Sequence, residues 1–270
     1  PQDGMCSESE YGAMPNWDVS NVTDMSNAFR FKTNFNADIS AWDVSSVTDF
    51  GGMFYEARAF NQDISNWNVS NATSMADMFS NARVFNQDIS VWNVSNVTHM
   101  NGMFNQNYNF NIDLSAWDVS NVTNMAAMFR YASAFNQNLS SWNISNVNDL
   151  NDFGHGSLIS VENYDALLTA WSALTLQQGV TFSSSTLQYC TAGDARQSII
   201  DNFGWSITDA GLATGCSSSD ELTPITDSNF HAAITNCLNT NPQDGMCSES
   251  EYGAMPNWDV SNVTDMSNAF

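Results

Sequence analysis

A 25-residue repeat constrains the fold of this chain more than any other feature. The motif FNQDISxWNVSNVTxMxxMF starts at Phe60 and recurs with few changes along the chain. Tryptophan returns at the same place in each copy, as Trp17, Trp42, Trp67, Trp92, Trp117 and Trp142. A fixed period of this size predicts a solenoid, in which each unit covers the apolar face of its neighbour. We therefore expect a stack of coils over residues 16–153.

The apolar spacing inside one repeat predicts an α/β coil with a short strand and a short helix. The pattern IxxWxVxxV over residues 39–47 matches the strand segment of leucine-rich repeats and points its tryptophan inward. Thr23 and its equivalents are expected to cap a helical turn. Met75, Met78 and Phe79 then follow at i, i+3 and i+4, which favours one apolar stripe facing the sheet.

Two polar columns accompany the apolar ones. An asparagine follows each returning phenylalanine, and stacked asparagines can bond one another and the unpaired backbone of a turn. These residues form the asparagine ladder: Asn36, Asn61, Asn86, Asn111 and Asn136. The outer face of the predicted sheet carries a second column, a candidate ligand-binding face made of Asp43, Asn68, Asn93, Asp118 and Asn143.

A third column is acidic and is a candidate calcium site. It consists of Asp38, Asp63, Asp88 and Asp113. Adjacent strands lie roughly 4.7 to 4.9 Å apart, so two of these carboxylates could share one cation. The alternative is that each aspartate caps its own turn and faces water, and neither an EF-hand loop nor a G-G-x-G-x-D repeat is present. No other cofactor is expected.

The motif WDVSNVTDM…MF…FNQDIS resembles the repeat of the BspA-like leucine-rich-repeat bacterial surface proteins. The resemblance covers residues 16–153, with departures at Phe50, Ala72 and Asn148. It implies a secreted or cell-surface protein associated with adhesion and binding, and it brings no catalytic residues.

Charge and cysteine content fit that setting. A net charge of −23 argues against nucleic acid and anionic membranes as partners. Cys6 recurs as Cys247, which leaves four cysteines per period. An even number suggests disulfides in an oxidising compartment, with Cys190–Cys216 and Cys237–Cys247 as the local pairings. Zinc is the alternative, but no C-x-x-C pair is present.

A second, longer repeat divides the chain. Residues 1–29 and 242–270 are identical, and we interpret the sequence as a window from a tandem array. Residues 1–15 would end an N-terminal cap, 154–216 would form a small α/β C-terminal cap, and 217–224 a linker. Residues 225–270 would be the helical cap and first coil of the next unit, with Phe230, Ala233, Ile234, Cys237 and Leu238 on one helix face.

These features predict an extracellular structural protein, the subunit of a head-to-tail filament or long surface fibre, with copies of itself as partners. The alternative is a surface adhesin that binds host or neighbouring-cell ligands through its exposed sheet face. An enzyme is not expected, because His99, His155 and His231 lie in no nucleophile motif.

Overall fold

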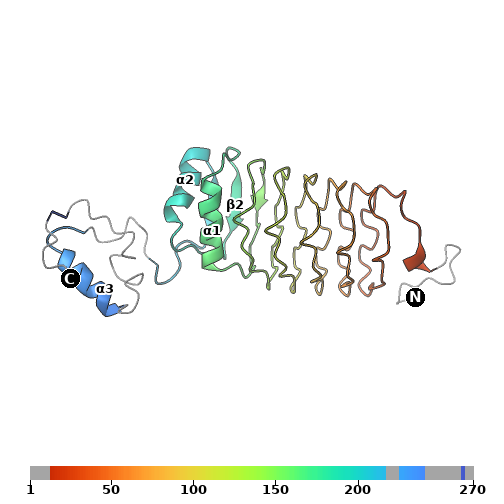
Figure 1. The fold of residues 1–270 in the computed structure, drawn as a ribbon, viewed down its shortest axis with the longest axis horizontal. Helices are drawn as coiled ribbons and strands as arrows, with labels where there is room; N and C mark the ends of the chain where they lie inside the picture. The colour runs from red at the N-terminus through yellow and green to blue at the C-terminus, as the bar shows by residue number, and fades with distance from the viewer. Residues whose placement is uncertain (1–12, 217–224, 241–262, 265–270) are drawn as a thin grey trace.

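The computed structural model describes residues 13–216, 225–240 and 263–264. Figure 1 shows an elongated stack of coils that lie side by side along one axis. A module with helices α1 and α2 closes the end away from the N-terminus, and helix α3 lies beyond it. Before the first coil, a single 3-10 turn, η1, spans Met14–Asn16.

Neighbouring coils are joined through one eight-residue segment, residues 24–31 and its equivalents every 25 residues, here called the ladder segment. Parallel bridges link its first residue in six successive coils: Asp24, Asp49, Ser74, His99, Asn124 and Asp149. Every second residue then donates its N–H to the next coil. Met25 bonds Asp49 O at 2.9 Å and Asn27 bonds Gly51 O at 2.8 Å. This row of backbone bonds runs along the stack and holds the coils in register.

The helix expected in the ladder segment is not formed. Two positions per coil have left-handed backbone, which ends any helix after a single turn. The first set has φ between 54° and 64° and comprises Asn27, Gly52, Asp77, Gly102, Ala127 and Asp152. The second set is Phe31, Glu56, Asn81, Gln106, Tyr131 and Gly156. The threonine expected as a helix cap instead bonds the coil before it, because the Thr48 Oγ1–H donates to Thr23 O at 3.1 Å.

The strand expected over residues 39–47 is not formed either. Trp42 N–H donates to Ile39 O at 3.1 Å and Val47 N–H to Val44 O at 2.9 Å, so the segment is two consecutive reverse turns. No strand or α-helix lies between residues 17 and 149, all of which the structure describes. Neighbouring coils therefore pair through their ladder segments, and not through residues 39–47 and their equivalents.

The core is a set of aromatic columns. They lie between the ladder segments on one side of the coils and residues 39–47 and their equivalents on the other. Within a coil two phenylalanine rings stack, with centroids 3.8 Å apart for Phe54 and Phe60. Between coils the rings also stack, with centroids 5.6 Å apart for Phe54 and Phe79. From Phe50 to Phe153 the apolar side chains of these columns are almost completely buried. Each such side chain contributes about 1.5 to 3 kcal/mol of transfer free energy, so adjacent coils stabilise each other.

A small α/β module covers the last coil. Its parallel sheet has the order β1 (Leu150–Asn151), β2 (Thr181–Ser184) and β3 (Ser206–Asp209), and β1 continues the ladder segments. Helix α1 spans Val161–Ser172 and α2 spans Gly193–Phe203. Ser160 caps α1 as expected, and Gly204 ends α2 with φ of 65°.

Two features fix the module. The Asp165 carboxylate accepts hydrogen bonds from the N–H groups of Cys190, Thr191 and Ala192, which lie immediately before α2. The expected disulfide between Cys190 and Cys216 is present. Together they tie the loop before α2 to α1 and to the end of the module.

Helix α3 (Phe230–Thr240) belongs to a second, separate core cluster of Ile225, Phe230, Ala233 and Ile234. Val263 packs against this cluster. The expected apolar face is present except at Leu238, which is 46% exposed. Cys237 is disulfide-bonded, whereas its expected partner Cys247 lies outside the described residues, as does Cys6.

Candidate functional site

The tryptophan column is part of the core. From Trp42 to Trp142 each indole is buried, and its Nε1–H donates to a backbone carbonyl 28 residues earlier at 2.9 to 3.2 Å. Trp17 is partly buried and stacks on Trp42 with ring centroids 6.4 Å apart. From Trp42 to Trp142 these side chains therefore join adjacent coils and present almost no free surface to a ligand.

The asparagine ladder also joins coils. The Oδ1 of each ladder asparagine accepts the backbone N–H of the next one, at 2.9 to 3.0 Å. The C-terminal module continues the ladder with different residues, because Asn136 Oδ1 accepts the Ser160 N–H at 2.8 Å and the Asn163 Nδ2–H at 2.8 Å. This arrangement uses the side-chain oxygens structurally and aligns α1 with the coils.

The candidate ligand-binding face is exposed, but each of its side chains closes a local turn. Asp43 Oδ1 accepts the Ser45 N–H at 3.0 Å, and the other four residues bond the serine two positions on in the same way. The Ser45 hydroxyl and N–H hold the pKa of Asp43 below its ordinary value. All five residues stay exposed, so the turn bonds leave this face accessible to a partner.

The candidate calcium column has the same turn geometry. The N–H groups of Ser40, Ser65, Ser90 and Ser115 donate to the Oδ1 atoms of the four aspartates at 2.8 to 3.0 Å. This agrees with the alternative in which each aspartate caps its own turn. Among the described residues, no group of three or more His, Cys, Asp or Glu side chains could hold a metal ion. Calcium binding stays a prediction, which thermal melts with and without EDTA would test.

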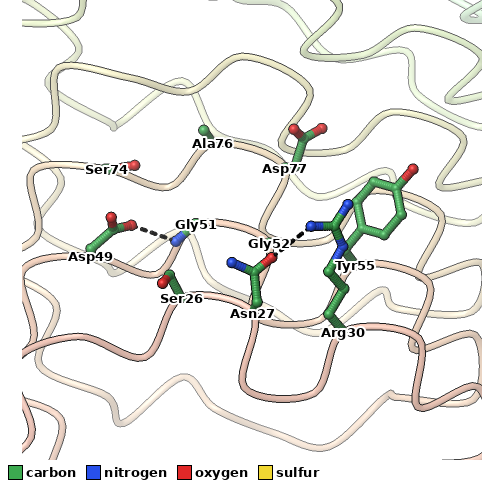
Figure 2. A pocket seen from close by; sticks show the side chains of 10 residues that line it. All are labelled: Ser26, Asn27, Arg30, Asp49, Gly51, Gly52, Tyr55, Ser74, Ala76 and Asp77. Carbon is green, nitrogen blue, oxygen red and sulfur yellow. Dashed lines mark hydrogen bonds between the residues drawn. The ribbon is translucent and has the colours of Figure 1, made fainter.

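A solvent-open cavity lies on the ladder segments of the first three coils and was not anticipated from the sequence. It has a volume of about 350 Å³ and is lined by Ser26, Asn27, Arg30, Asp49, Gly51, Gly52, Tyr55, Ser74, Ala76 and Asp77. Figure 2 shows the Arg30 guanidinium beside the Tyr55 ring and Asn27 facing Gly52. The cavity therefore combines a cation, an aromatic ring and two carboxylates.

Specific contacts order the cavity wall. Arg30 Nη1–H donates to Asn27 Oδ1 at 3.1 Å, and its guanidinium carbon lies 4.8 Å from the Tyr55 ring centroid. Burial raises the pKa of the Asp77 carboxyl, and the nearby Arg30 partly offsets that rise. A polar, uncharged or zwitterionic small molecule would fit this mixture of charges better than a strongly charged one.

Two glycines line this cavity, Gly51 and Gly52. A Cβ placed on Gly52 would lie 2.8 Å from Asn27 Oδ1, closer than a Cβ approaches another heavy atom. Along the same column Asp77 extends over Gly102, which likewise has no room for a Cβ. The sequence signal for a left-handed turn was that Gly, Asn or Asp occupies five of the six equivalent positions, the exception being Ala127.

These observations define a repeat protein in which each coil contacts its neighbours and extended polar columns cover the outside. The chain matches the family described as Mycoplasma protein of unknown function, DUF285, over residues 4–108, 73–171 and 245–270. These ranges cover well over half of the sequence, and the chain belongs to this bacterial, repeat-type surface-protein family. No curated protein and no solved structure matches the chain. In the described ranges, every helix is too short or too polar to span a bilayer.

Proposed function

We propose that this protein is an extracellular structural protein, the subunit of a head-to-tail filament or long tandem-repeat surface fibre. In this proposal the stack of coils is a leucine-rich-repeat-like solenoid of the BspA-like kind, closed by the module that contains α1 and α2. The protein has no catalytic role here, and its main partners are copies of itself.

The identity of residues 1–29 and 242–270 carries the proposal. Between the starts of the two copies in the sequence lies an elongated stack whose two ends differ, since one end is the first coil and the other is the α/β module. Units that repeat in one direction with unlike ends join through a heterologous contact, which builds a filament wherever its rotation does not close a ring. Identical units in a row therefore favour a fibre.

Charge and covalent chemistry support the same setting. A net charge of −23 keeps parallel fibres apart and opposes lateral aggregation. The Cys190–Cys216 disulfide fits an oxidising compartment, as expected outside the cell.

Electron microscopy and intact mass of the natural material test the proposal together. We expect thin unbranched fibres with an axial repeat that corresponds to one period, and a polypeptide mass that reflects several periods. Dispersed single particles at all salt and calcium concentrations, with the mass of one period, would contradict it.

A binding function is the second candidate, and the cavity at Tyr55 favours it. The 270-residue chain can be screened against glycans and host surface proteins. Any ligand that uses the cavity should lose affinity with Tyr55→Ala and keep it with Tyr108→Ala. Tyr108 is a suitable control because it also lies beside an arginine, Arg83, but outside the cavity.

A further inference from the structure

We propose that one edge of the coil stack binds a linear carboxylated polysaccharide in which acidic and neutral sugars alternate. This surface, here called the basic edge, consists of residues 30–33 and their equivalents in the next four coils, namely 55–58, 80–83, 105–108 and 130–133. The contact goes beyond the proposed fibre and does not require one, because a single stack carries the whole basic edge.

Positive charge in the coils is confined to this edge. Residues 13–153 include five basic residues, and all of them lie in the basic edge: Arg30, Lys32, Arg58, Arg83 and Arg130. The edge contains one acidic residue, Glu56, whereas the rest of residues 13–153 contains twelve acidic residues and no lysine or arginine. An anionic partner is therefore attracted to this edge and repelled by the other surfaces of the coils.

Backbone hydrogen bonds align the edge residues of successive coils. In each coil the second edge residue donates its N–H to the carbonyl of the first edge residue of the next coil. The four bonds, each of 2.6 to 2.9 Å, are Phe31 to Tyr55, Glu56 to Ser80, Asn81 to Asn105 and Gln106 to Arg130. Chain segments paired in this way lie roughly 4.7 to 4.9 Å apart. The basic edge is therefore a continuous row along the stack, which suits a linear partner better than a compact one.

Exposed aromatic rings accompany the cations. The guanidinium carbon of Arg83 lies 5.5 Å from the Tyr108 ring centroid, and that of Arg130 lies 4.7 Å from the Tyr131 ring centroid. Both tyrosines are 38% exposed. A tyrosine ring packs against apolar surface while its hydroxyl stays in water, and a guanidinium pairs with carboxylates. A carboxylated sugar presents an apolar ring face and an anion side by side, and so matches both side chains.

Arg83 is the best placed of these cations to bind a carboxylate. Arg58 Nη2 lies 2.8 Å from Glu56 Oε2, and Arg130 Nε lies 3.1 Å from Asp152 Oδ2, so both have an acidic neighbour. Within the described part of the chain Arg83 forms no ion pair. Its Nε–H donates to Asn81 Oδ1 at 2.8 Å, which orients the guanidinium and leaves its Nη groups for a ligand.

Charge density favours a polysaccharide over other polyanions. Double-stranded DNA carries one negative charge per roughly 1.7 Å of its axis, and most of that charge would face the acidic turns of the coils. A second copy of this chain has a net charge of −23 and is repelled as a whole. A polysaccharide whose acidic sugars are separated by neutral ones brings fewer charges near those turns.

A fluorescent hyaluronan oligosaccharide, which alternates acidic and neutral sugars, is the probe that tests this contact. It is titrated into the 270-residue chain and followed by anisotropy. We expect binding that weakens as salt is added, and no binding of dextran, which is neutral. Arg83→Gln and Tyr108→Ala should each weaken binding about fivefold, since each removes one contact.

Asn93→Asp is the matched control for Arg83→Gln. Both substitutions lower the net charge by one, but Asn93 lies on the outer turns, where Asp43 and Asp118 occupy equivalent positions. The control should leave binding of hyaluronan unchanged. Thermal melts of all variants check that each one folds.

A substitution that strengthens binding gives a second test. Glu56→Gln removes the acidic partner of Arg58 and should tighten binding about twofold, the scale of one exposed ion pair. Glutamine fits this position, because Gln106 is the equivalent residue two coils later and has the same left-handed backbone. Asp43→Asn raises the net charge equally, away from the edge, and should have no effect.

Three outcomes would overturn the inference. The first is that neither hyaluronan nor unsulfated chondroitin binds at low salt. The second is that Arg83→Gln and Asn93→Asp weaken binding equally, which would show a response to net charge alone. The third is that poly-glutamate binds as tightly as hyaluronan, which would assign the edge to acidic protein segments. None of these results bears on fibre formation, which electron microscopy tests separately.

Discussion

Aspartate and asparagine replace each other along the outer turns of this protein because only the Oδ1 atom, which both have, closes the turn. Each side chain accepts the N–H of the serine two residues on, and an amide oxygen does this as an ionised carboxylate does. The column on the candidate ligand-binding face mixes both types from Asp43 to Asn143. Charge at these positions is therefore free to vary, while the acceptor is not.

The asparagine ladder makes the first residue-scale prediction. Asn86→Ala removes the Oδ1 that accepts the Asn111 N–H at 3.0 Å. We expect the free energy of unfolding to fall by about 0.5 to 1.5 kcal/mol, the usual net worth of one hydrogen bond. Asn86→Asp keeps an acceptor and should cost less. Urea unfolding monitored by tryptophan fluorescence measures both, and an equal loss for the two variants would contradict the ladder role.

The calcium column makes a prediction about pH. The hydroxyl and N–H of Ser40 and Ser90 lower the pKa of Asp38 and Asp88, and the N–H and hydroxyl of Ser65 lower the pKa of Asp63. A lowered folded-state pKa stabilises the fold above the ordinary value of 3.8, and this contribution is lost as the pH falls below it.

Replacing those three aspartates by asparagine should therefore make stability less sensitive to acid. We expect the difference in melting temperature between pH 6 and pH 3 to be smaller in the triple variant than in wild type. A pH dependence identical to that of wild type would show that the turns gain nothing from ionisation.

At the scale of the element, the sequence predicts the buried columns better than the backbone that carries them. The repeat period identifies which side chains face inward, because Trp67 and Phe79 must be covered in every coil. The repeat period does not reveal that the ladder segment, which contains the methionines, is a series of turns. Met75, Met78 and Phe79 have helical spacing, and only the left-handed Asp77 between them ends the helix.

The repeat pattern does not reveal the cavity for the same reason. Its floor depends on Gly51 and Gly52, which look like ordinary variants of the repeat until the left-handed backbone is seen. The pattern of residues 39–47 predicts a strand although the segment forms two short turns, because these turns also bury Trp42 and Val44. The Asp-x-Ser pairs at residues 38–40 and 43–45 were the available signal for those turns.

Paired substitutions in the left-handed column give an element-scale prediction. Gly102→Ala adds a Cβ against Asp77 Oδ1 at a positive φ, and we expect it to cost about 1 to 3 kcal/mol. Ala127→Gly relieves the same backbone strain where alanine is present, and should stabilise by up to about 1 kcal/mol. Chemical denaturation measures both, and changes of the same sign would contradict the assigned role of this column.

At the scale of the whole molecule, one coil can be deleted without loss only if the ladder segments of its two neighbours can pack against each other. Deleting residues 63–87 removes one period, restores the local sequence and leaves Gly52 beside Gly102. Deleting residues 88–112 also restores the local sequence, but it places Asp77 against Ala127, which has the Cβ that Gly102 lacks. The two deletions are matched in length and differ in this contact.

We expect the first deletion to fold with little loss of stability and the second to lose more. Each should shorten the molecule by roughly 4.7 to 4.9 Å, the spacing of one coil. Small-angle scattering measures the length, and thermal unfolding measures the stability. Equal melting temperatures for the two deletions would show that the contact at Gly102 has no energetic weight.

The rows of backbone bonds between ladder segments have a mechanical consequence. They run along the long axis, so a force applied to the two ends loads them directly, one coil after another. Each coil that opens would release 25 residues of chain, which extend to roughly 80 to 90 Å. A tether with this construction lengthens in discrete steps under a sudden load while its covalent chain stays intact.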